Sequence, residues 1–190
     1  MARLEPVDAD TTDPALARVF DVFRSTGREV PLLYRVLANS PAMLDAWVGM
    51  AWPLRSEPTT SRALRELQIM RVAVLTRASF EWHAHWPAAV KAGVTPGQLA
   101  ALGDPESSDH FDDREKAALR GTDEIITEGA ASADAMRELS THFADSECIE
   151  LVLTAAFYSC VSGTLLSLGV EAPEEVESEA LAVYRAITAP

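Results

Sequence analysis

Cysteine and basic residues are scarce in this chain of 190 residues. The two cysteines, Cys148 and Cys160, stand twelve positions apart, and the sequence contains no C-x-x-C pair. That usage favours reduced thiols over a disulfide framework or a zinc site. Sixteen basic residues face 29 acidic ones, which gives a net charge of -13. No window is basic enough to follow a phosphate backbone, so we expect no nucleic-acid partner.

Targeting and membrane-spanning patterns are also missing. The first ten residues hold three acidic side chains and no apolar core, so we expect no secretory signal. The most apolar stretch runs over residues 147–169, but Glu147, Glu150 and its small polar residues favour a buried core helix over a membrane span. We therefore expect a soluble cytoplasmic protein without a membrane partner.

Strand patterns are absent as well, whereas helical periodicity recurs along most of the chain. The sequence has no alternating segments bounded by turn pairs. Its apolar residues instead repeat at helical spacing, with caps such as Asp13 before Pro14 and Ser40 before Pro41. This pattern predicts an all-α fold of about eight helices, and the uniform composition predicts a single domain over residues 1–190.

The chemically informative stretch runs from Glu66 to Gly93, where polar side chains interrupt an apolar, alanine-rich run. We predict two helices here, joined near Arg77 and Ala78. On the second helix Glu81 and His85 are four residues apart and share one face. An imidazole titrates near neutrality, and a carboxylate one turn away can fix its tautomer and raise its pKa. This pair therefore has the spacing of a general acid and base.

Other interpretations of the same residues stay open. A glutamate and a histidine at this spacing are also common as a surface pair. Glu66, on the preceding helix, can supply a second proton carrier or remain protonated in an apolar site and donate a hydrogen bond. His83 lies roughly 200° round the helix from Glu81 and His85, so H-x-H does not form a chelate without distortion. A metal bound by Glu66, Glu81 and His85 is stereochemically possible, but nothing in the sequence requires it.

Aromatic residues surround the Glu81 and His85 pair. Phe80, Trp82 and Trp86 lie within a turn or so of it in sequence. Their apolar surface would enlarge pKa shifts by desolvation and would suit a planar or ring-shaped ligand. We expect these three residues to be candidate walls of a substrate pocket.

Two motifs in this region resemble a known family. The segments R-x-L-Q-I-x-R-V-A-x-L-T and F-E-W-x-x-H-x-P-x-A-x-K-A-G-V-T are similar to those of the AhpD-like, or carboxymuconolactone decarboxylase, family. The likeness covers about residues 30–171, which would form the core of one AhpD-like domain, with an acidic C-terminal helix at 173–188. The resemblance implies a homo-oligomeric helical bundle, a dimer, trimer or hexamer, with its active site near the E-W-x-x-H helix.

The redox branch of that family carries a glutamate, a C-x-x-C twelve residues later, and a histidine four residues after the second cysteine. Placed on this chain, the pattern falls on Glu66, on Ala78 and Glu81, and on His85. Both cysteines are therefore replaced. Without a thiolate there is no nucleophile for a peroxide, so we expect no alkyl hydroperoxidase activity.

The remaining glutamates and histidine resemble the catalytic residues of the cofactor-free decarboxylases in the family. The resemblance implies that His85 donates a proton to a developing dienolate, that Glu81 orients His85, and that Glu66 or Arg71 positions a small carboxylate or carbonyl substrate. We predict a lyase or isomerase without a cofactor. The alternatives are a redox or stress protein that has lost its cysteines, and a non-catalytic oligomeric binding protein. The predicted catalytic residues are Glu66, Glu81 and His85, and the predicted substrate-binding residues are Arg71, Phe80, Trp82 and Trp86.

Overall fold

The fold is helical throughout the part of the chain that the structure describes. The computed structural model describes residues 2–172 and 178–189, which form ten helices and no strand. The all-α prediction is confirmed. The number of helices exceeds the predicted eight or so, and two of the ten, α2 (Leu32–Leu37) and α6 (Pro96–Ala101), are only six residues long.

The chain divides into two compact units. The first comprises Met1–Glu57 and Leu165–Glu171, and it holds α1 (Pro14–Arg24), α2 and α3 (Pro41–Ser56). As the sequence predicts, α1 begins at a proline, and the side chain of the preceding aspartate accepts a hydrogen bond from a backbone N–H of the first turn. Buried apolar residues of α1 and α3 form the core of this unit.

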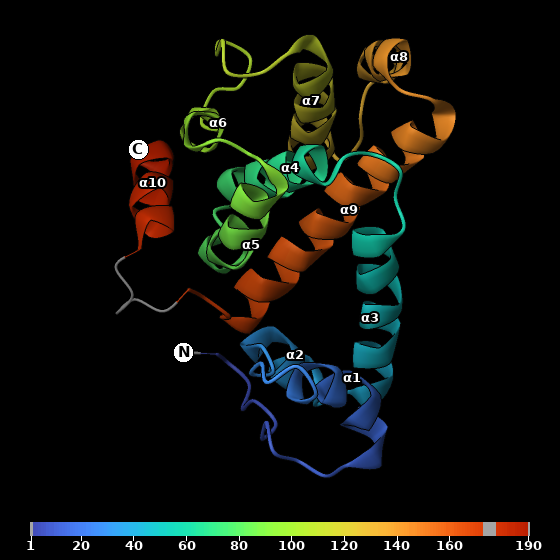
Figure 1. Cartoon of the computed structure of the whole chain (residues 1–190), viewed down its shortest axis with the longest axis vertical. Helices are drawn as coiled ribbons and strands as arrows, with labels where there is room; N and C mark the ends of the chain where they lie inside the picture. The colour runs from blue at the N-terminus through green and yellow to red at the C-terminus, as the bar shows by residue number, and fades with distance from the viewer. Residues whose placement is uncertain (1, 173–177, 190) are drawn as a thin grey trace. The chain divides into compact units, whose positions relative to one another are not determined.

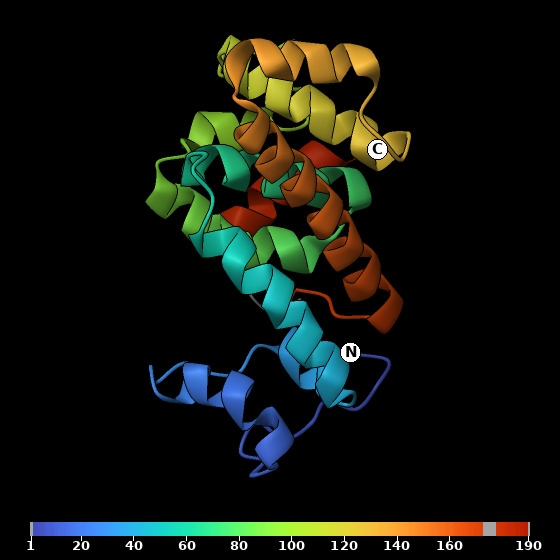
Figure 2. The same ribbon diagram turned by 90° about the vertical axis from the view of Figure 1, so that its right-hand side faces the viewer.

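The second unit comprises Pro58–Thr164 and Ala172–Pro190 and carries the residues of chemical interest. Within it α4 packs against α5 and α7, and α7 packs against α8, as Figures 1 and 2 show. Its helices are α4 (Arg62–Thr76), α5 (Ser79–Ala92), α6, α7 (Asp113–Thr127), α8 (Ala133–His142), most of α9 (Asp145–Leu168) and α10 (Glu179–Thr188).

A short turn between α4 and α5 sets the geometry of the site. Arg77 ends α4 in the left-handed conformation with φ at 59°, and Ala78 then precedes the first residue of α5. The chain reverses over these two residues, as predicted, so the two helices lie side by side. Gly93, with φ at 101°, ends α5 in a conformation that favours glycine.

Helix α4 lies deep in the second unit, since every residue from Leu64 to Val74 is buried. Its polar side chains must therefore find partners inside the protein. Gln68 donates from Nε2 to Oγ1 of Thr122 on α7 at 2.9 Å and to the carbonyl of Leu151 on α9 at 3.3 Å. These bonds fix α4 between α7 and α9, two residues after Glu66.

The C-terminal region contains a helix, as predicted from the sequence. This helix, α10, begins at Glu179, and residues 173–177 of the predicted helix lie outside the described residues. The long helix α9 meets the length and composition of a membrane span, a test that core helices of soluble proteins also meet. Its buried residues, such as Cys148 and Leu151, pack in the protein core.

Candidate active site

A buried histidine lies between two buried glutamates in the second unit. Nδ1 of His85 is 2.8 Å from Oε2 of Glu66 on α4, and Nε2 is 3.0 Å from Oε1 of Glu81 on α5. Glu66 is 0% exposed, Glu81 3% and His85 7%. The structure therefore brings the three predicted catalytic residues together, with one carboxylate at each ring nitrogen.

Glu66 has a second partner at its other carboxylate oxygen. Arg62, one helical turn earlier on α4, forms an ion pair with Oε1 of Glu66. Its side chain is 32% exposed, whereas that of Glu66 is fully buried. The four charges alternate from Arg62 through Glu66 and His85 to Glu81, which compensates the burial of each.

The same contacts set the protonation states. Burial by itself would lower the pKa of His85, but Tyr158, Glu81 and the hydrogen bond to Glu66 hold it well above its ordinary value. Burial by itself would raise the pKa of Glu66, but the hydrogen bond and charge of His85 and the charge of Arg62 outweigh that effect, so the pKa is lowered. Both directions favour an imidazolium at His85 beside an ionised Glu66.

Tyr158 of α9 forms the third side of this cluster. Its ring lies edge-on to the imidazole, with ring centroids 5.1 Å apart and planes at 87°. Tyr158 is 1% exposed, so it shields His85 from solvent on that side. The site is thus assembled from α4, α5 and α9.

The two edges of the imidazole differ in how firmly they are held. The Nδ1 edge donates to Glu66, which is itself fixed by Arg62. At the Nε2 edge Oε1 of Glu81 lies 3.0 Å away as an ion-pair partner, but within the described part of the chain it accepts no aligned hydrogen bond. Glu66 therefore orients His85 at Nδ1, and the orienting role predicted for Glu81 at Nε2 stays a prediction.

This arrangement does not resemble a metal site. Glu66 and Glu81 approach opposite edges of the imidazole, so the three side chains do not converge on one point. Among residues 2–172 and 178–189, no group of three or more His, Cys, Asp or Glu residues has the geometry to hold a metal ion. The donor set fits proton transfer better than coordination.

Arg71 lies on another face of α4 and does not join the cluster. Its guanidinium donates to both carboxylate oxygens of Asp123 on α7, at 2.7 and 2.8 Å. It also donates to the carbonyls of Leu102 at 2.6 Å and Gly103 at 3.2 Å. These contacts give Arg71 a structural role, and the substrate-binding role predicted from the sequence stays a prediction.

The three aromatic residues near the pair differ in their surroundings. Trp82 is 0% exposed, donates from Nε1 to the carbonyl of Ala180 on α10 at 2.6 Å, and packs against Tyr184. It belongs to the apolar core. Trp86 packs beside Trp82 at 5.7 Å between ring centroids and is partly exposed, as is Phe80. Phe80 and Trp86 retain surface with which to contact a ligand.

Arg62 and Tyr158 are the members of the cluster that sequence reasoning missed. Arg62 had a signal, because it stands four residues before Glu66 and so lies on the same helical face. Arg71 stands five residues after Glu66, about 140° round the helix, which already places it elsewhere. Tyr158 is 73 positions from His85, and no local pattern links the two.

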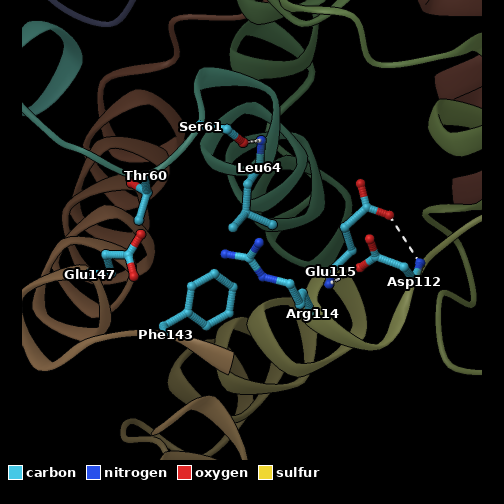
Figure 3. A pocket seen from close by; sticks show the side chains of 8 residues that line it. All are labelled: Thr60, Ser61, Leu64, Asp112, Arg114, Glu115, Phe143 and Glu147. Carbon is cyan, nitrogen blue, oxygen red and sulfur yellow. Dashed lines mark hydrogen bonds between the residues drawn. The ribbon is translucent and has the colours of Figure 1, made fainter. Parts of the chain in front are cut away.

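A separate cavity of about 150 Å³ lies where α4, α7 and α9 begin (Figure 3). Arg114 extends over the ring of Phe143, with 4.7 Å between its guanidinium carbon and the ring centroid. The carboxylates of Asp112 and Glu115 cap the start of α7, and that of Glu147 accepts from the backbone before α9. Helix capping therefore accounts for the carboxylates around this cavity, and His85 does not line it.

The all-helical fold that encloses the buried Glu–His–Glu cluster is an AhpD-like fold. Residues 41–124 match the model of the carboxymuconolactone decarboxylase family, and this segment includes Glu66, Glu81 and His85. The family resemblance read from the sequence is confirmed by this match. No curated protein is significantly similar in sequence.

Solved structures agree on the fold. An uncharacterized peroxidase-related protein from Ralstonia eutropha JMP134 with an alkylhydroperoxidase AhpD core is 15% identical, covers 100% of this chain and 97% of its own, and has a TM-score of 0.77. A peroxidase-related protein from Silicibacter sp. TM1040 is 16% identical over 95% of this chain and 99% of its own, with a TM-score of 0.75.

A third solved structure is a cysteine-to-alanine variant of the debrominase Bmp8 in complex with 2,3,4-tribromopyrrole. It is 16% identical, covers 98% of this chain and 98% of its own, and has a TM-score of 0.75. At these identities the likeness establishes the shared fold.

Proposed function

We propose that the protein is a cofactor-free lyase or isomerase that acts on a small carboxylate or carbonyl compound by acid–base chemistry at His85. The observation that carries the proposal is the buried imidazole, held at Nδ1 by Glu66 and with its Nε2 3.0 Å from Oε1 of Glu81, which accepts no aligned hydrogen bond within the described residues. A positioned acid of this kind protonates a carbanion or enolate as it forms.

As a lyase, the site would act in three steps. The substrate carboxylate leaves as CO₂, and its bonding electrons pass to the adjoining unsaturated system as a dienolate. His85 then transfers the Nε2 proton to that dienolate, and solvent returns a proton to the imidazole. The low-dielectric surroundings of Tyr158 and the neighbouring core favour this charge-neutralising step.

The comparisons are compatible with a small ring-shaped ligand. The debrominase of the same fold was solved with a halogenated pyrrole. In this chain Ala78 and Glu81 occupy the positions of the redox-branch cysteines, so a thiol reaction is not proposed. Phe80 and Trp86, both partly exposed, are the proposed contacts for such a ring.

The test is release of CO₂ from two kinds of probe, a small β-keto acid and a β,γ-unsaturated lactone carboxylate. His85→Asn removes the proton donor but keeps a polar side chain between the two carboxylates. We expect turnover by the wild-type protein and a loss of about 100-fold or more in the variant, with the fold retained by circular dichroism. Equal turnover in both proteins would refute the role of His85.

We also propose that the protein is a cytoplasmic homo-oligomer. Ile149 is 60% exposed and Leu153 41% exposed, one turn apart on α9, which is an apolar surface typical of subunit contacts. Light scattering with size-exclusion chromatography measures the oligomeric state directly. A stable monomer at micromolar concentration would contradict it.

A further inference from the structure

The Glu81 carboxylate oxygen beside His85 accepts no aligned hydrogen bond within the described residues. Oε1 of Glu81 lies 3.0 Å from Nε2 of His85, and the side chain of Glu81 is 4% exposed. A buried carboxylate oxygen normally accepts at least one hydrogen bond, because desolvation without a partner is costly. Within the described residues this oxygen accepts none, so a ligand that displaces its 3.0 Å ion-pair contact with Nε2 can give it a proton.

The acid and the acceptor lie on one edge of the imidazole, and the opposite edge is occupied. Glu66 accepts from Nδ1, and Arg62 holds Glu66 in place. A ligand at the Nε2 edge therefore meets a proton donor and a carboxylate oxygen 3.0 Å apart. That separation matches a carbonyl oxygen and the hydrogen on its adjoining carbon.

We propose that Glu81 is the catalytic base of a 1,3-proton shift and that the substrate class is a small enolisable carbonyl compound. This inference rests on the proposed function and deepens it, because it adds a base to the acid already assigned. It adds isomerisation between keto and enol forms to the reactions proposed for this site.

The step balances without a further reactant. Oε1 of Glu81 takes the proton from the carbon next to the carbonyl, and the C–H electrons form the C=C bond. The carbonyl π electrons pass to oxygen, which takes the proton from Nε2 of His85. After the enol leaves, the proton on Glu81 crosses directly to Nε2, restoring the imidazolium and the carboxylate.

Glu66 is a positioning residue in this scheme. It does not reach the Nε2 edge, but its hydrogen bond to Nδ1 keeps the other proton pointing at the ligand. Tyr158, edge-on to the ring, limits rotation of the imidazole and keeps water away. The base and the acid thus depend on contacts from α4 and α9.

The experiment is deuterium incorporation from D₂O into three probes, phenylpyruvate, 2-oxobutanoate and acetylacetone, followed by proton NMR. Wild-type protein should accelerate exchange at the carbon next to the carbonyl. Glu81→Gln keeps the size and the acceptor oxygen but is not a base, so the accelerated exchange should fall by about 100-fold or more. Glu138→Gln, an exposed glutamate of α8 paired with Arg120, is the matched control and should leave exchange unchanged.

A second variant guards against a folding defect. Glu81→Asp keeps the charge but withdraws the oxygen by one methylene, so exchange should fall while the fold and the His85 imidazole signals persist. Exchange within tenfold of wild type in Glu81→Gln overturns the inference, as does the absence of wild-type exchange with all three probes. If His85→Asn still abolishes CO₂ release in either case, the proposed function stands. If neither His85→Asn nor Glu81→Gln changes any activity, both proposals fail.

Discussion

Oε2 of Glu66 accepts a hydrogen bond from Nδ1 of His85 at 2.8 Å, although the two residues are 19 positions apart and lie on different helices. This contact fixes which proton of the imidazolium is presented to a ligand. It also ties α4 to α5 across the turn at Arg77 and Ala78. Changes to Glu66 should therefore affect both stability and chemistry.

Glu66→Gln should destabilise the protein by about 3 kcal/mol, because it leaves the imidazolium of His85 and Arg62 without their shared counter-charge. The pKa of His85 should fall in the variant. Urea unfolding measures the first effect, and NMR titration of the imidazole measures the second. Glu138→Gln, which is exposed, should change the free energy of unfolding by less than about 1 kcal/mol.

Stability should decline above neutral pH. The pKa of His85 is raised in the folded state, with 6.5 as its ordinary value, so folding retains a proton that the unfolded chain releases. The resulting stabilisation is fully present below about pH 6.5 and is lost as the pH rises through the higher pKa of the folded state. Urea unfolding across this range should show the decline in wild-type protein. A parallel decline in His85→Asn would contradict this assignment.

Arg71→Ala should cost about 3 kcal/mol in stability, because it removes a two-pronged contact with Asp123 and leaves the carbonyls of Leu102 and Gly103 without their donor. The NMR titration of His85 should be unchanged. If the variant instead remains fully stable and loses only substrate affinity, Arg71 is a substrate ligand after all. Asp123→Asn, which removes the charge of the partner carboxylate, should also lower the free energy of unfolding.

Trp82→Phe should destabilise the protein by about 1–2 kcal/mol, since it leaves the carbonyl of Ala180 without the indole donor and removes apolar contact with Tyr184. Hydrogen exchange should show weaker protection of α10, the helix that this bond ties to α5. Trp86→Phe, at a partly exposed position, should leave that protection intact. If α10 is as well protected in Trp82→Phe as in the wild type, the hydrogen bond from Trp82 to Ala180 does not hold α10 in place.

No peroxide reduction is expected with a lipoyl-type or thioredoxin-type reductant. Cys148 and Cys160 lie on the continuous helix α9, where twelve residues rise about 18 Å, so they cannot form a disulfide within one chain. Ala78 and Glu81 supply no thiolate. A peroxidase assay of the wild type and of the Cys148→Ser/Cys160→Ser double variant measures this. Turnover that disappears in the double variant would contradict it.

The sequence predicted those features that depend on local chemistry. The cap at Asp13, the turn near Arg77 and the stop at Gly93 all follow from residues within one helical turn, and each is present. The pairing of Glu81 with His85 also follows from spacing alone. Local patterns were therefore sufficient for the fold class and for two of the three members of the candidate site.

Features that depend on packing between helices could not be predicted from local sequence patterns. The hydrogen bond from Nδ1 of His85 to Glu66 depends on how deeply α4 packs against α5, which spacing along the chain does not show. The role of Arg71 depends on Asp123, 52 positions away, and the contact of Tyr158 with His85 depends on the path of α9. These relationships arise from tertiary structure, which no single stretch of sequence encodes.

The position of Oε1 of Glu81 beside His85 also determines the stereochemistry of the proposed exchange. One carboxylate oxygen on one edge of the imidazole can approach a bound methylene group from one side only. When the enol is reprotonated at the site before it leaves, one of the two prochiral hydrogens on the methylene carbon of 2-oxobutanoate should exchange with solvent and the other should remain. The deuterated product would then be chiral, with a handedness dictated by the position of α5 beside α4.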